Sequence, residues 1–355
     1  MDTRVFKVDP VRPERDIVEY AAGVIRAGGL VAFPTETVYG LGADALNASA
    51  VARIYEVKGR PLDNPVIVHI SDFNQLDIVA SRVPEEAYRL AEKLWPGPLT
   101  LLLPRNIKVP RKVTAGLETV AVRMPAHPVA LELIRASKNP IAAPSANISG
   151  KPSPTRGDHV VRDLYSKVEV ILDGGETLYG VESTIINILT DPPKLLRPGA
   201  YPVEVIEEIL GRRIEVPDFA RGLGEAPQAL APGMKHRHYA PNTELILVES
   251  IRGDFDAVRG AVTGEAEKLA GKGLKVAIIS FKEHSSFYKG VKAQILELGS
   301  RENMFEIARN LFHTLRVLDT LNVDAAIVEC VEERGLGLAI MNRLRKASSK
   351  RIVLP

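Results

Sequence analysis

Up to about residue 210, short β-rich apolar runs alternate with segments of helical periodicity, and this alternation strongly limits the possible folds. The runs predict strands at Leu30–Phe33, Val66–Ile70, Thr100–Leu103, Val120–Arg123, Ile141–Ala143, Val168–Leu172 and Ser183–Ile188. The helical patterns predict helices at Asp16–Ala27, Ala48–Val57, Pro84–Leu94 and Val129–Ala136. This mixture predicts a layered α/β or α+β domain over residues 1–210, with its loops at the strand ends.

A linker and a second, smaller domain are predicted beyond this point. Residues 211–241 show no sustained period and are rich in Gly, Pro and basic residues, which is typical of a linker. Strand-like segments then follow at Glu244–Val248, Lys275–Ser280, Ala293–Leu298 and Ala325–Val331, with helical stretches around 253–271 and 302–321. This order predicts a parallel, Rossmann-like α/β domain over residues 242–355, whose role the pattern leaves open.

Composition excludes several classes of protein. A formal net charge of +2 argues against a protein whose whole surface is positively charged for binding nucleic acid. It does not exclude a local basic cleft. Cys330 is the single cysteine, so an intrachain disulfide and a thiolate metal cluster are excluded, and its apolar neighbours predict a buried, inert thiol. Charges interrupt the N-terminus where a signal peptide needs apolar residues, and no apolar run could span a bilayer. We therefore expect a cytoplasmic protein without a membrane segment.

Two motifs at strand and helix ends carry candidate chemistry. "PTETVYGLGADA", residues 34–45, follows an apolar run and is expected to form a polar, glycine-containing loop at a strand end. In "KGRPLDNPVIVHI", Lys58 and Arg60 flank a glycine at the end of a predicted helix. Two cations beside a flexible backbone suit a polyphosphate, although cations at an exposed helix end are also favoured by the helix dipole. His69 closes an apolar strand, where a satisfied, half-buried histidine is more common than a ligand.

Two later motifs add small polar groups and arginines. In "PIAAPSANISGKPSPT", Ser145 and Asn147 follow an apolar strand, at a position where α/β sheets commonly bind ligands. Ser and Asn are also common in turns that bind no ligand. Arg123 lies within an apolar run, so it needs either a carboxylate partner or an anionic ligand. In "GVESTIINI…LLRPGA", Ser183 opens a strand and Arg197 lies between Leu196 and Pro198.

Standard nucleotide-binding and hydrolase signatures are absent. The chain has no G-x-x-x-x-G-K-[ST], complete G-x-G-x-x-G, H-E-x-x-H or G-x-S-x-G, and "GADA" and "GLGLA" are only fragments of such patterns. If a nucleotide binds, the positive charge must therefore come from the side chains of Lys58, Arg60 and Arg197.

The four motifs occur in one order, and together they closely resemble the threonylcarbamoyl-AMP synthase family, which has the YrdC-like fold. The resemblance covers residues 10–210 and includes the family's K-x-R and S-x-N signatures, as Lys58/Arg60 and Ser145/Asn147. "PGMKHRHYAP" and "GLGLAIMNRLRKA" are similar to the longer, two-domain branch of the family. The resemblance implies an open, twisted, mixed sheet with helices for the first domain.

The resemblance also implies a reaction. L-threonine, bicarbonate or CO2, and ATP would give L-threonylcarbamoyladenylate and pyrophosphate, with Mg2+ accompanying ATP. A tRNA threonylcarbamoyl transferase complex would then pass the group to an adenosine beside the anticodon of certain tRNAs, and direct contact of this chain with tRNA is left open. The enzyme class implied is a nucleotidyltransferase.

Site residues follow from the resemblance by matching motif positions. The implied ATP contacts are Lys58, Arg60, Asn64, Thr119, Ser145, Asn147, Ser153 and Arg197, of which Lys58, Arg60, Ser145 and Asn147 are the expected catalytic residues. The implied threonine contacts are Thr37, His69, Arg123, Ser183 and the backbone of Ala143. Arg123 is the expected clamp for the carboxylate, because its planar guanidinium can bind a carboxylate through two hydrogen bonds.

A hypothesis about the linker rests on its composition. "MKHRHYAP", residues 234–241, combines cationic and titratable side chains with a tyrosine and is bounded by Pro232 and Pro241. A plain tether would be smaller and more polar, whereas a lid over bound phosphate would use these side chains. We therefore expect His238 and Tyr239 to close over ATP, the alternative being a linker docked permanently on one domain.

Two other functions remain as alternatives. The fold could present a basic concave face to double-stranded RNA without catalysis, which the near-neutral charge disfavours. The chain could instead be a related carbamoyl transferase, because YrdC-like domains also occur in hydrogenase-maturation proteins. Those proteins carry a zinc finger, which a chain with one cysteine cannot form.

Overall fold

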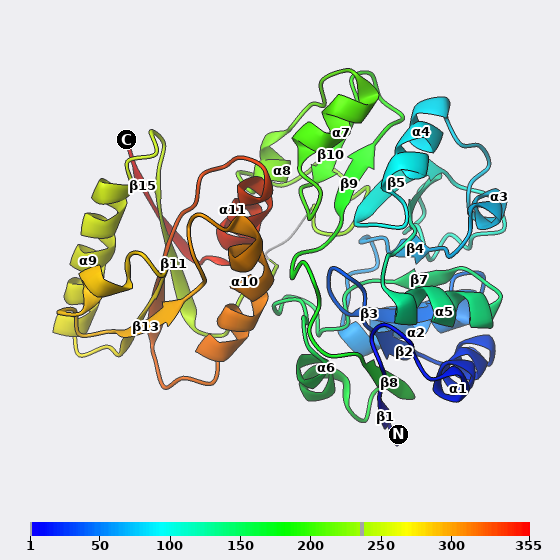
Figure 1. Ribbon diagram of the computed structural model, residues 1–355, viewed down its shortest axis with the longest axis horizontal. Coiled ribbons are helices and arrows are strands. Elements are labelled where there is room, and N and C mark those ends of the chain that lie inside the picture. The colour runs from blue at the N-terminus through cyan, green and yellow to red at the C-terminus, as the bar shows by residue number, and fades with distance from the viewer. Residues whose placement is uncertain (1, 235–237) are drawn as a thin grey trace. The chain divides into compact units, whose positions relative to one another are not determined.

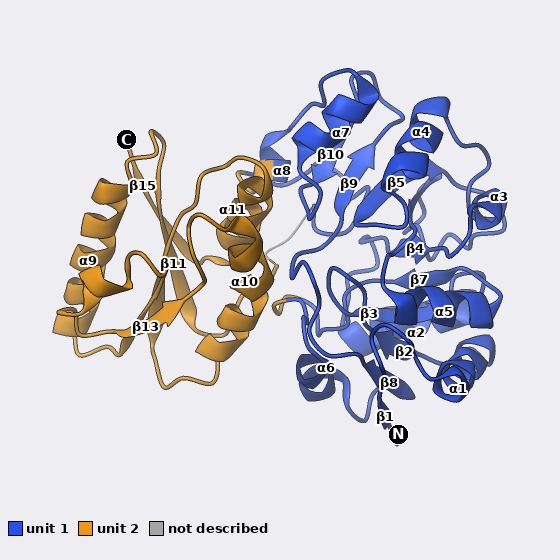
Figure 2. Ribbon diagram, in the orientation of Figure 1, with its two compact units in different colours: residues 1–149, 153–220, 224–236 blue, residues 150–152, 221–223, 237–355 orange. Residues whose placement is uncertain are grey.

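The computed structural model describes residues 2–234 and 238–355. The chain forms two compact units, coloured separately in Figure 2: unit 1 comprises residues 1–149, 153–220 and 224–236, and unit 2 comprises residues 150–152, 221–223 and 237–355. The predicted linker, residues 211–241, is therefore not a separate segment, since parts of it belong to each unit. Residues 235–237 of the predicted lid lie outside the described residues.

Unit 1 is built on a mixed sheet, which has ten strands over the part of the chain that is described. β1 and β2 each pair in parallel with β8, as do β4 with β6 and β5 with β9, whereas the remaining neighbours are antiparallel. The predicted open mixed sheet is confirmed. In spatial order the strands are β1 (Arg4–Lys7), β8 (Val170–Asp173), β2 (Val31–Phe33), β3 (Gly40–Asp44), β7 (Ile141–Ala143), β4 (Ile67–His69), β6 (Thr119–Arg123), β5 (Leu99–Pro104), β9 (Thr184–Asn187) and β10 (Lys194–Arg197).

Helices cover both faces of this sheet, which explains why its strands are continuous apolar runs (Figure 1). Val31 and Phe33 pack in a core with helices α1 and α5, whereas Leu30 and Ala32 pack in a core with α2 and α6. Alternate residues of one strand thus enter opposite cores, as the two-residue repeat of a strand requires. The helices of unit 1 are α1 (Arg15–Arg26), α2 (Ala48–Lys58), α3 (Leu76–Val79), α4 (Glu85–Leu94), α5 (Pro128–Ser137), α6 (Gly157–Leu164), α7 (Val203–Leu210) and α8 (Asp218–Arg221), whose last residue belongs to unit 2.

The predicted loop over residues 34–45 is wrong in its second half. Residues 40–44 form β3, which pairs with β2 and turns the chain back along the sheet. Gly42 is required by packing: a Cβ there would lie 2.7 Å from the Phe33 ring and 2.7 Å from Ile141 Cγ2. This glycine therefore makes room for two neighbouring strands, and the polar loop is restricted to residues 34–39.

Residues 226–234 are docked on unit 1. Ala226, Ala231 and Met234 are at most 3% exposed and pack in one core with sheet residues such as Leu102 and Ile185. Periodicity did not predict this burial, because an irregular segment can bury single side chains that do not recur at the spacing of a helix or a strand. This part of the predicted linker is therefore a docked segment of unit 1.

Unit 2 is the predicted parallel α/β domain. Its strands occur in the order β13-β12-β14-β11-β15, and every pair is parallel. The periodicity predicts four strands here, and the structure adds a fifth strand, β15, and the helix α11. The strands are β11 (Glu244–Ser250), β12 (Val276–Ser280), β13 (Gln294–Glu297), β14 (Ala325–Glu329) and β15 (Lys350–Leu354), and the helices are α9 (Phe255–Gly271), α10 (Met304–Leu318) and α11 (Leu336–Ala347).

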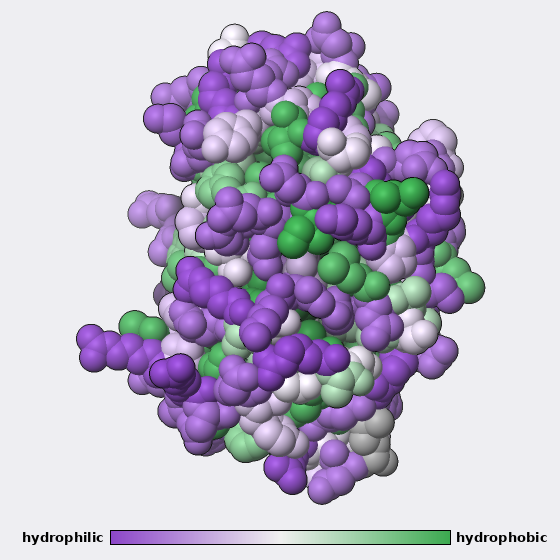
Figure 3. Space-filling model, turned by 90° about the vertical axis from the view of Figure 1, so that its right-hand side faces the viewer, coloured by the Kyte–Doolittle hydropathy of each residue, from purple (hydrophilic) through white to green (hydrophobic). Residues whose placement is uncertain are grey.

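The single cysteine is buried, as its apolar neighbours predict. Cys330 is 3% exposed, and burial raises the pKa of its thiol, which confirms a buried side chain. Within the described residues, no helix combines the length and apolarity needed to cross a lipid bilayer. The face shown in Figure 3 is mainly hydrophilic, with hydrophobic side chains scattered among the polar ones.

Candidate active site

The loop that joins β2 to β3 is held in shape by its own threonines. Thr35 Oγ1 donates to the carbonyl of Val38 (2.6 Å) and lies 2.8 Å from Thr37 Oγ1. The backbone amide of Thr37 donates to Thr35 Oγ1 at 3.2 Å. Thr35, Glu36 and Thr37 are each at most 5% exposed. The loop is therefore a buried, preorganised turn at the ends of two strands, β2 and β3, that lie within the sheet.

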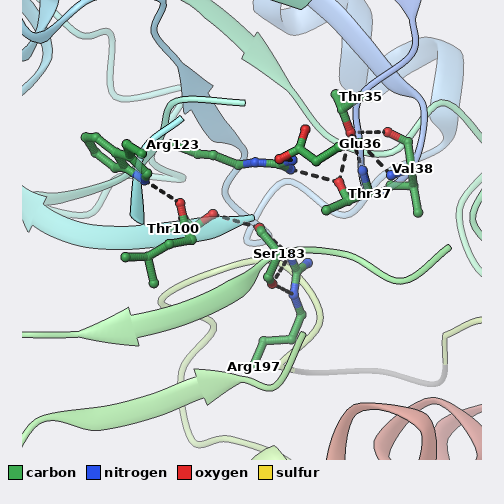
Figure 4. A network of polar contacts seen from close by, with 10 residues as sticks. Thr35, Glu36, Thr37, Val38, Thr100, Arg123, Ser183 and Arg197 are labelled. Atoms are coloured by element: carbon green, nitrogen blue, oxygen red, sulfur yellow. Dashed lines mark hydrogen bonds and ion pairs between the residues drawn. The ribbon is translucent and has the colours of Figure 1, made fainter. Parts of the chain in front are cut away.

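Arg123, at the end of β6, joins this loop. Its Nη1 donates to Thr37 Oγ1 (2.9 Å), and its Nη2 lies 2.6 Å from Glu36 Oε1 (Figure 4). Strand register places Arg123 directly opposite His69 of β4 on one side and Thr100 of β5 on the other. The carboxylate partner that a buried Arg123 needs is therefore Glu36, a residue of the first motif to which the sequence assigned no role.

Several buried polar atoms around this ion pair lack hydrogen bonds. Arg123 Nη2 and Glu36 Oε1 are at ion-pair distance, but neither has a hydrogen-bond partner of acceptable geometry among the described residues. The same holds for Glu36 Oε2, Arg123 Nε and His69 Nδ1 and, at the other end of β6, for Thr119 Oγ1. Because buried polar groups are normally hydrogen-bonded, such a concentration indicates a site completed by a polar ligand.

His69 is neutral in this environment. It is 4% exposed, and its ring lies edge-on to Phe33 with ring centroids 6.4 Å apart. Burial, together with the nearby charge of Arg123, lowers the pKa of His69 to about 3. A neutral imidazole can donate through one nitrogen and accept through the other, so His69 is suited to orient a ligand without adding charge.

A second polar cluster lies next to the first and contains Ser183 and Arg197 (Figure 4). Arg197 donates through Nη2 to the Ser183 carbonyl (2.9 Å) and to Ser183 Oγ (3.2 Å). Thr100 Oγ1 lies 2.7 Å from Ser183 Oγ, which connects this cluster to β5. Arg197 also donates to the carbonyl of Pro232 in the docked segment (3.4 Å). The predicted threonine contact Ser183 and the predicted ATP contact Arg197 are thus adjacent.

Lys58 holds the loop that carries Ser145 and Asn147. The helix α2 ends at Lys58, and Gly59 follows in the left-handed conformation, with φ 59°. Lys58 is 2% exposed, and its ammonium donates to the carbonyl of Ser145 (2.6 Å) and to that of Asn147. The sequence predicted that Lys58 faces phosphate, whereas here its ammonium is directed at two backbone carbonyls. The two signature motifs are therefore in direct contact.

Arg60 is held in position by hydrogen bonds to the loop that follows it. Its Nε and Nη2 donate to the carbonyl (2.9 Å) and to Oδ1 (2.7 Å) of Asn64, and Nη2 also donates to the Pro65 carbonyl (2.7 Å). Asn64 is 2% exposed, whereas Arg60 is half-buried. Arg60 and Asn64, both predicted ATP contacts, act as one rigid pair.

The remaining predicted residues are distributed along the same sheet and in unit 2. Ser153 Oγ donates to Glu182 Oε1 (2.7 Å), so a second glutamate to which the sequence assigned no role touches a predicted contact. Glu36 and Glu182 each directly precede a predicted threonine contact, which is the signal that could have identified them. Ala143 ends β7, beside Gly40 of β3. His238 and Tyr239 belong to unit 2, where Tyr239 is 6% exposed and its ring centroid lies 5.2 Å from that of Phe312.

A protein-held metal centre does not fit these residues. In the part of the chain that is described, no group of three or more His, Cys, Asp or Glu side chains is placed to hold a metal ion. Mg2+ bound to nucleotides takes most of its ligands from phosphates and water. The Mg2+ that the resemblance implies would therefore enter with ATP, as part of the substrate.

The fold and the site define a YrdC-type α/β protein with a C-terminal parallel α/β unit. Residues 23–199 match the Sua5/YciO/YrdC family model, described as telomere recombination, and residues 201–349 match the model described as threonylcarbamoyl-AMP synthase, C-terminal domain. YciO of Escherichia coli has the fold of the first unit, with a TM-score of 0.52, 25% identity and coverage of 56% of this chain and 96% of its own.

Full-length relatives identify the family. Threonylcarbamoyl-AMP synthase of Pyrococcus abyssi is 54% identical over 340 residues, which cover 95% of each chain, and that of Bacillus subtilis is 45% identical over 95% of this chain and 94% of its own. The structure of P. abyssi Sua5 with L-threonine superposes with a TM-score of 0.92, 52% identity and coverage of 99% and 100% of the two chains. The chain belongs to the threonylcarbamoyl-AMP synthase family, and the predicted enzyme class, a nucleotidyltransferase, is confirmed.

Proposed function

We propose that the buried polar cluster of unit 1 is where L-threonine, bicarbonate or CO2, and ATP are joined to give L-threonylcarbamoyladenylate and pyrophosphate. This is the activity predicted from the motifs and named for the family's members. The observation that carries the proposal is the group of incompletely hydrogen-bonded buried atoms on Glu36, Arg123 and His69, which come from three separate elements: the β2–β3 loop, β6 and β4.

An amino-acid zwitterion fits the Glu36–Arg123 pair. The carboxylate of threonine would bind Arg123, and the ammonium group of threonine would bind Glu36. Each charge of the zwitterion would then face a charge of opposite sign. The buried site would then stay neutral overall, which limits the cost of keeping charges away from water. His69 and Thr37 would contact the substrate beside the ion pair, and Ser183 and the Ala143 backbone would complete the small pocket.

The braced residues around Arg60 suit the polyphosphate. Arg60 and Arg197 bring positive charge, whereas Ser145, Asn147 and Ser153 bring small hydrogen-bonding groups. We propose that Lys58 acts mainly by holding the Ser145–Asn147 loop, because its ammonium already binds two of the carbonyls of that loop. Arginines held in fixed positions stabilise developing phosphate charge without reorganising during the reaction. Mg2+ would enter with ATP and help to neutralise the phosphates.

The reaction requires positioning more than acid–base chemistry. The threonine ammonium group first loses one proton to become an amine, and the amine loses a second proton to water as it adds to CO2, which gives a carbamate. A carbamate oxygen then attacks the α-phosphorus of ATP, the bond to the bridging oxygen breaks, and pyrophosphate leaves. Glu36 would accept the first of these protons, because the same carboxylate would hold the ammonium group.

We propose that His238 and Tyr239 close over bound ATP and shield the unstable adenylate from water. One solved structure similar to this chain is a P. abyssi Sua5 variant in which a histidine and a tyrosine are both changed to alanine, with a TM-score of 0.91 and 50% identity. We further propose that a tRNA threonylcarbamoyl transferase complex receives the product in the cytoplasm.

Pyrophosphate release by the full-length protein tests the proposal. The release is expected to require threonine, bicarbonate and ATP together, and the adenylate should be detectable by mass spectrometry. Pyrophosphate release that is independent of threonine would contradict the proposal. Turnover of carbamoyl phosphate in place of bicarbonate would indicate the carbamoyl transferase instead, and RNA binding without any turnover would indicate the RNA-binding module.

A further inference from the structure

The chain reverses its winding direction at the centre of the sheet in unit 2. β11 is followed by α9, which leads to β12, whereas its neighbour β14 is followed by α11, which leads to β15 on the opposite side of β11. α9 covers one face of the sheet, and α10 and α11 cover the other (Figure 1). In open parallel sheets, the crevice at the carboxyl ends of two such strands is the usual place for a ligand.

A cavity of about 710 Å³ lies at this position. Its lining comes from the end of β11 and the segment after it, the segment after β14, the helix α11, the strand β15, and Arg221 and Leu223. Gly222 has a φ of +79°, and a Cβ there would lie 3.1 Å from Arg345 Cβ, so this segment packs closely on α11. The volume lies within the range of sites for small molecules and cofactors.

Four arginines line the cavity against three glutamates: Arg221, Arg252, Arg345 and Arg351 against Glu249, Glu332 and Glu333. Arg345 is neutralised by Glu249 and Glu333, both at 2.9 Å, and Arg351 also pairs with Glu249. Arg252 is exposed and has no ion pair within the described ranges, and Arg221 lies 3.6 Å from Glu333 with 46% of its side chain exposed. The lining therefore carries one net positive charge, because Glu332 offsets one of the two arginines, Arg252 and Arg221, that no carboxylate holds at hydrogen-bond distance.

Helix α9 does not supply an anion site of its own. Its N-cap, Asp254, accepts a hydrogen bond from the amide of Ala257 at 2.9 Å, so a carboxylate already occupies this helix end. Part of the lining is apolar and contains Ile251 and Val353, which are 78% and 47% exposed. Such a wall suits a flat ring, which would cover apolar surface that is otherwise open to water.

We propose that this cavity is a second ligand site, which binds a small phosphate ester with an aromatic ring, of the size of a mononucleotide. Its phosphate would bind the guanidinium groups of Arg252 and Arg221, and its ring would lie against Ile251 and Val353. This site is separate from the catalytic cluster of unit 1 and does not depend on the proposed reaction.

Hydrogen–deuterium exchange on the full-length protein, with adenosine monophosphate as the probe, resolves the two sites. Binding at the second site should slow exchange in residues 249–255 and 330–336, whereas binding at the catalytic site should slow exchange in residues 34–39 and 58–64. The Arg252→Ala/Arg221→Ala double variant should weaken the first effect at least tenfold and leave the second unchanged. Arg213→Ala, which removes an arginine side chain that is 92% exposed in unit 1, is the matched control.

The outcomes separate the parts of the proposal. No slowing of exchange in residues 249–255 at millimolar adenosine monophosphate, or slowing that the double variant does not weaken, would overturn the site. Inorganic phosphate should act in the same residues but more weakly, because it lacks the ring. Equal effects of phosphate and adenosine monophosphate would overturn the role of the apolar wall.

Discussion

Glu36 and Arg123 form a buried ion pair in which Arg123 makes one side-chain hydrogen bond, to Thr37, and Glu36 makes none among the described residues. Their nearest atoms are 2.6 Å apart, yet both Glu36 oxygens lack a hydrogen-bond partner among the described residues. A buried ion pair is stabilised well only when its remaining lone pairs and protons are also satisfied. A bound amino acid would complete both partners at once, so this pair is the most direct point at which to test the site.

Glu36→Gln should weaken threonine binding strongly. The amide keeps the shape of the side chain but removes the charge that would hold the ammonium group, and loss of such a contact costs about 2–4 kcal/mol. Calorimetric titration with threonine measures the loss, with circular dichroism to confirm folding. Glu19→Gln, at a surface ion pair with Arg26, is the control and should leave threonine affinity unchanged. A folded Glu36→Gln variant with unaltered affinity would disprove the role of Glu36.

Arg60→Ala and Arg123→Ala should affect different substrates. Arg60→Ala is expected to abolish turnover and weaken ATP binding, because the guanidinium held by Asn64 would be lost. Arg123→Ala should chiefly weaken threonine binding, again by about 2–4 kcal/mol. Separate titrations with ATP and with threonine distinguish the two effects. Near-normal ATP affinity of Arg60→Ala would refute the phosphate assignment, and unfolding of both variants would indicate a structural role.

Lys58→Met should lower stability even without ligand. It removes the charged donor from the carbonyls of Ser145 and Asn147 in a side chain that is 2% exposed. Loss of a buried charged donor costs about 1.5–3 kcal/mol. Urea unfolding of the ligand-free protein measures this loss, with Lys272→Met at an exposed position as the control. If stability stays unchanged while the KM for ATP rises, Lys58 acts on phosphate directly.

Stability should fall as the pH drops below 6.5, in part because of His69. Its pKa of about 3 in the folded protein lies below the ordinary value of 6.5, so the unfolded chain binds a proton that the folded chain does not. The stabilisation is therefore complete above pH 6.5 and is lost progressively toward pH 3, by at most about 1.4 kcal/mol per pH unit. His69→Gln should flatten this dependence in urea unfolding between pH 7 and 4. Parallel curves for the two proteins would contradict it.

Removing the chain from residue 211 onward should lower the yield of intact adenylate. This truncation also removes the docked segment, residues 226–234, from unit 1. The truncated protein loses Ala226, Ala231 and Met234 from its core as well as the proposed lid residues. The double variant His238→Ala/Tyr239→Ala tests the lid without this loss. It should bind threonine normally but release less intact adenylate, as measured by mass spectrometry. Full adenylate yield from the double variant would show that these residues do not act as a lid.

The strands, their burial and the end of α2 could be predicted from local sequence. Continuous apolar runs such as Val31–Phe33 are characteristic of strands covered on both faces, and Gly59 supplies the left-handed residue that ends α2. The two-domain order and the parallel sheet of unit 2 follow from the alternation of runs and helical patterns. β3 was missed because its glycines, which make room for Phe33 and Ile141, are also typical of a turn.

The partners within the site depended on tertiary structure. Arg123 needed an anion, but its sequence neighbourhood could not indicate whether that anion was a ligand or Glu36, which a distant loop brings to the end of β6. Lys58 faces carbonyls of a loop 87 and 89 residues away, and residues 226–234 are buried although they have no period. The spacing of apolar residues predicts which side chains of a helix or strand are buried, because that spacing depends on the geometry of the single element. Which charged groups meet depends on the order and register of the strands, and those are decided by the packing of the whole sheet.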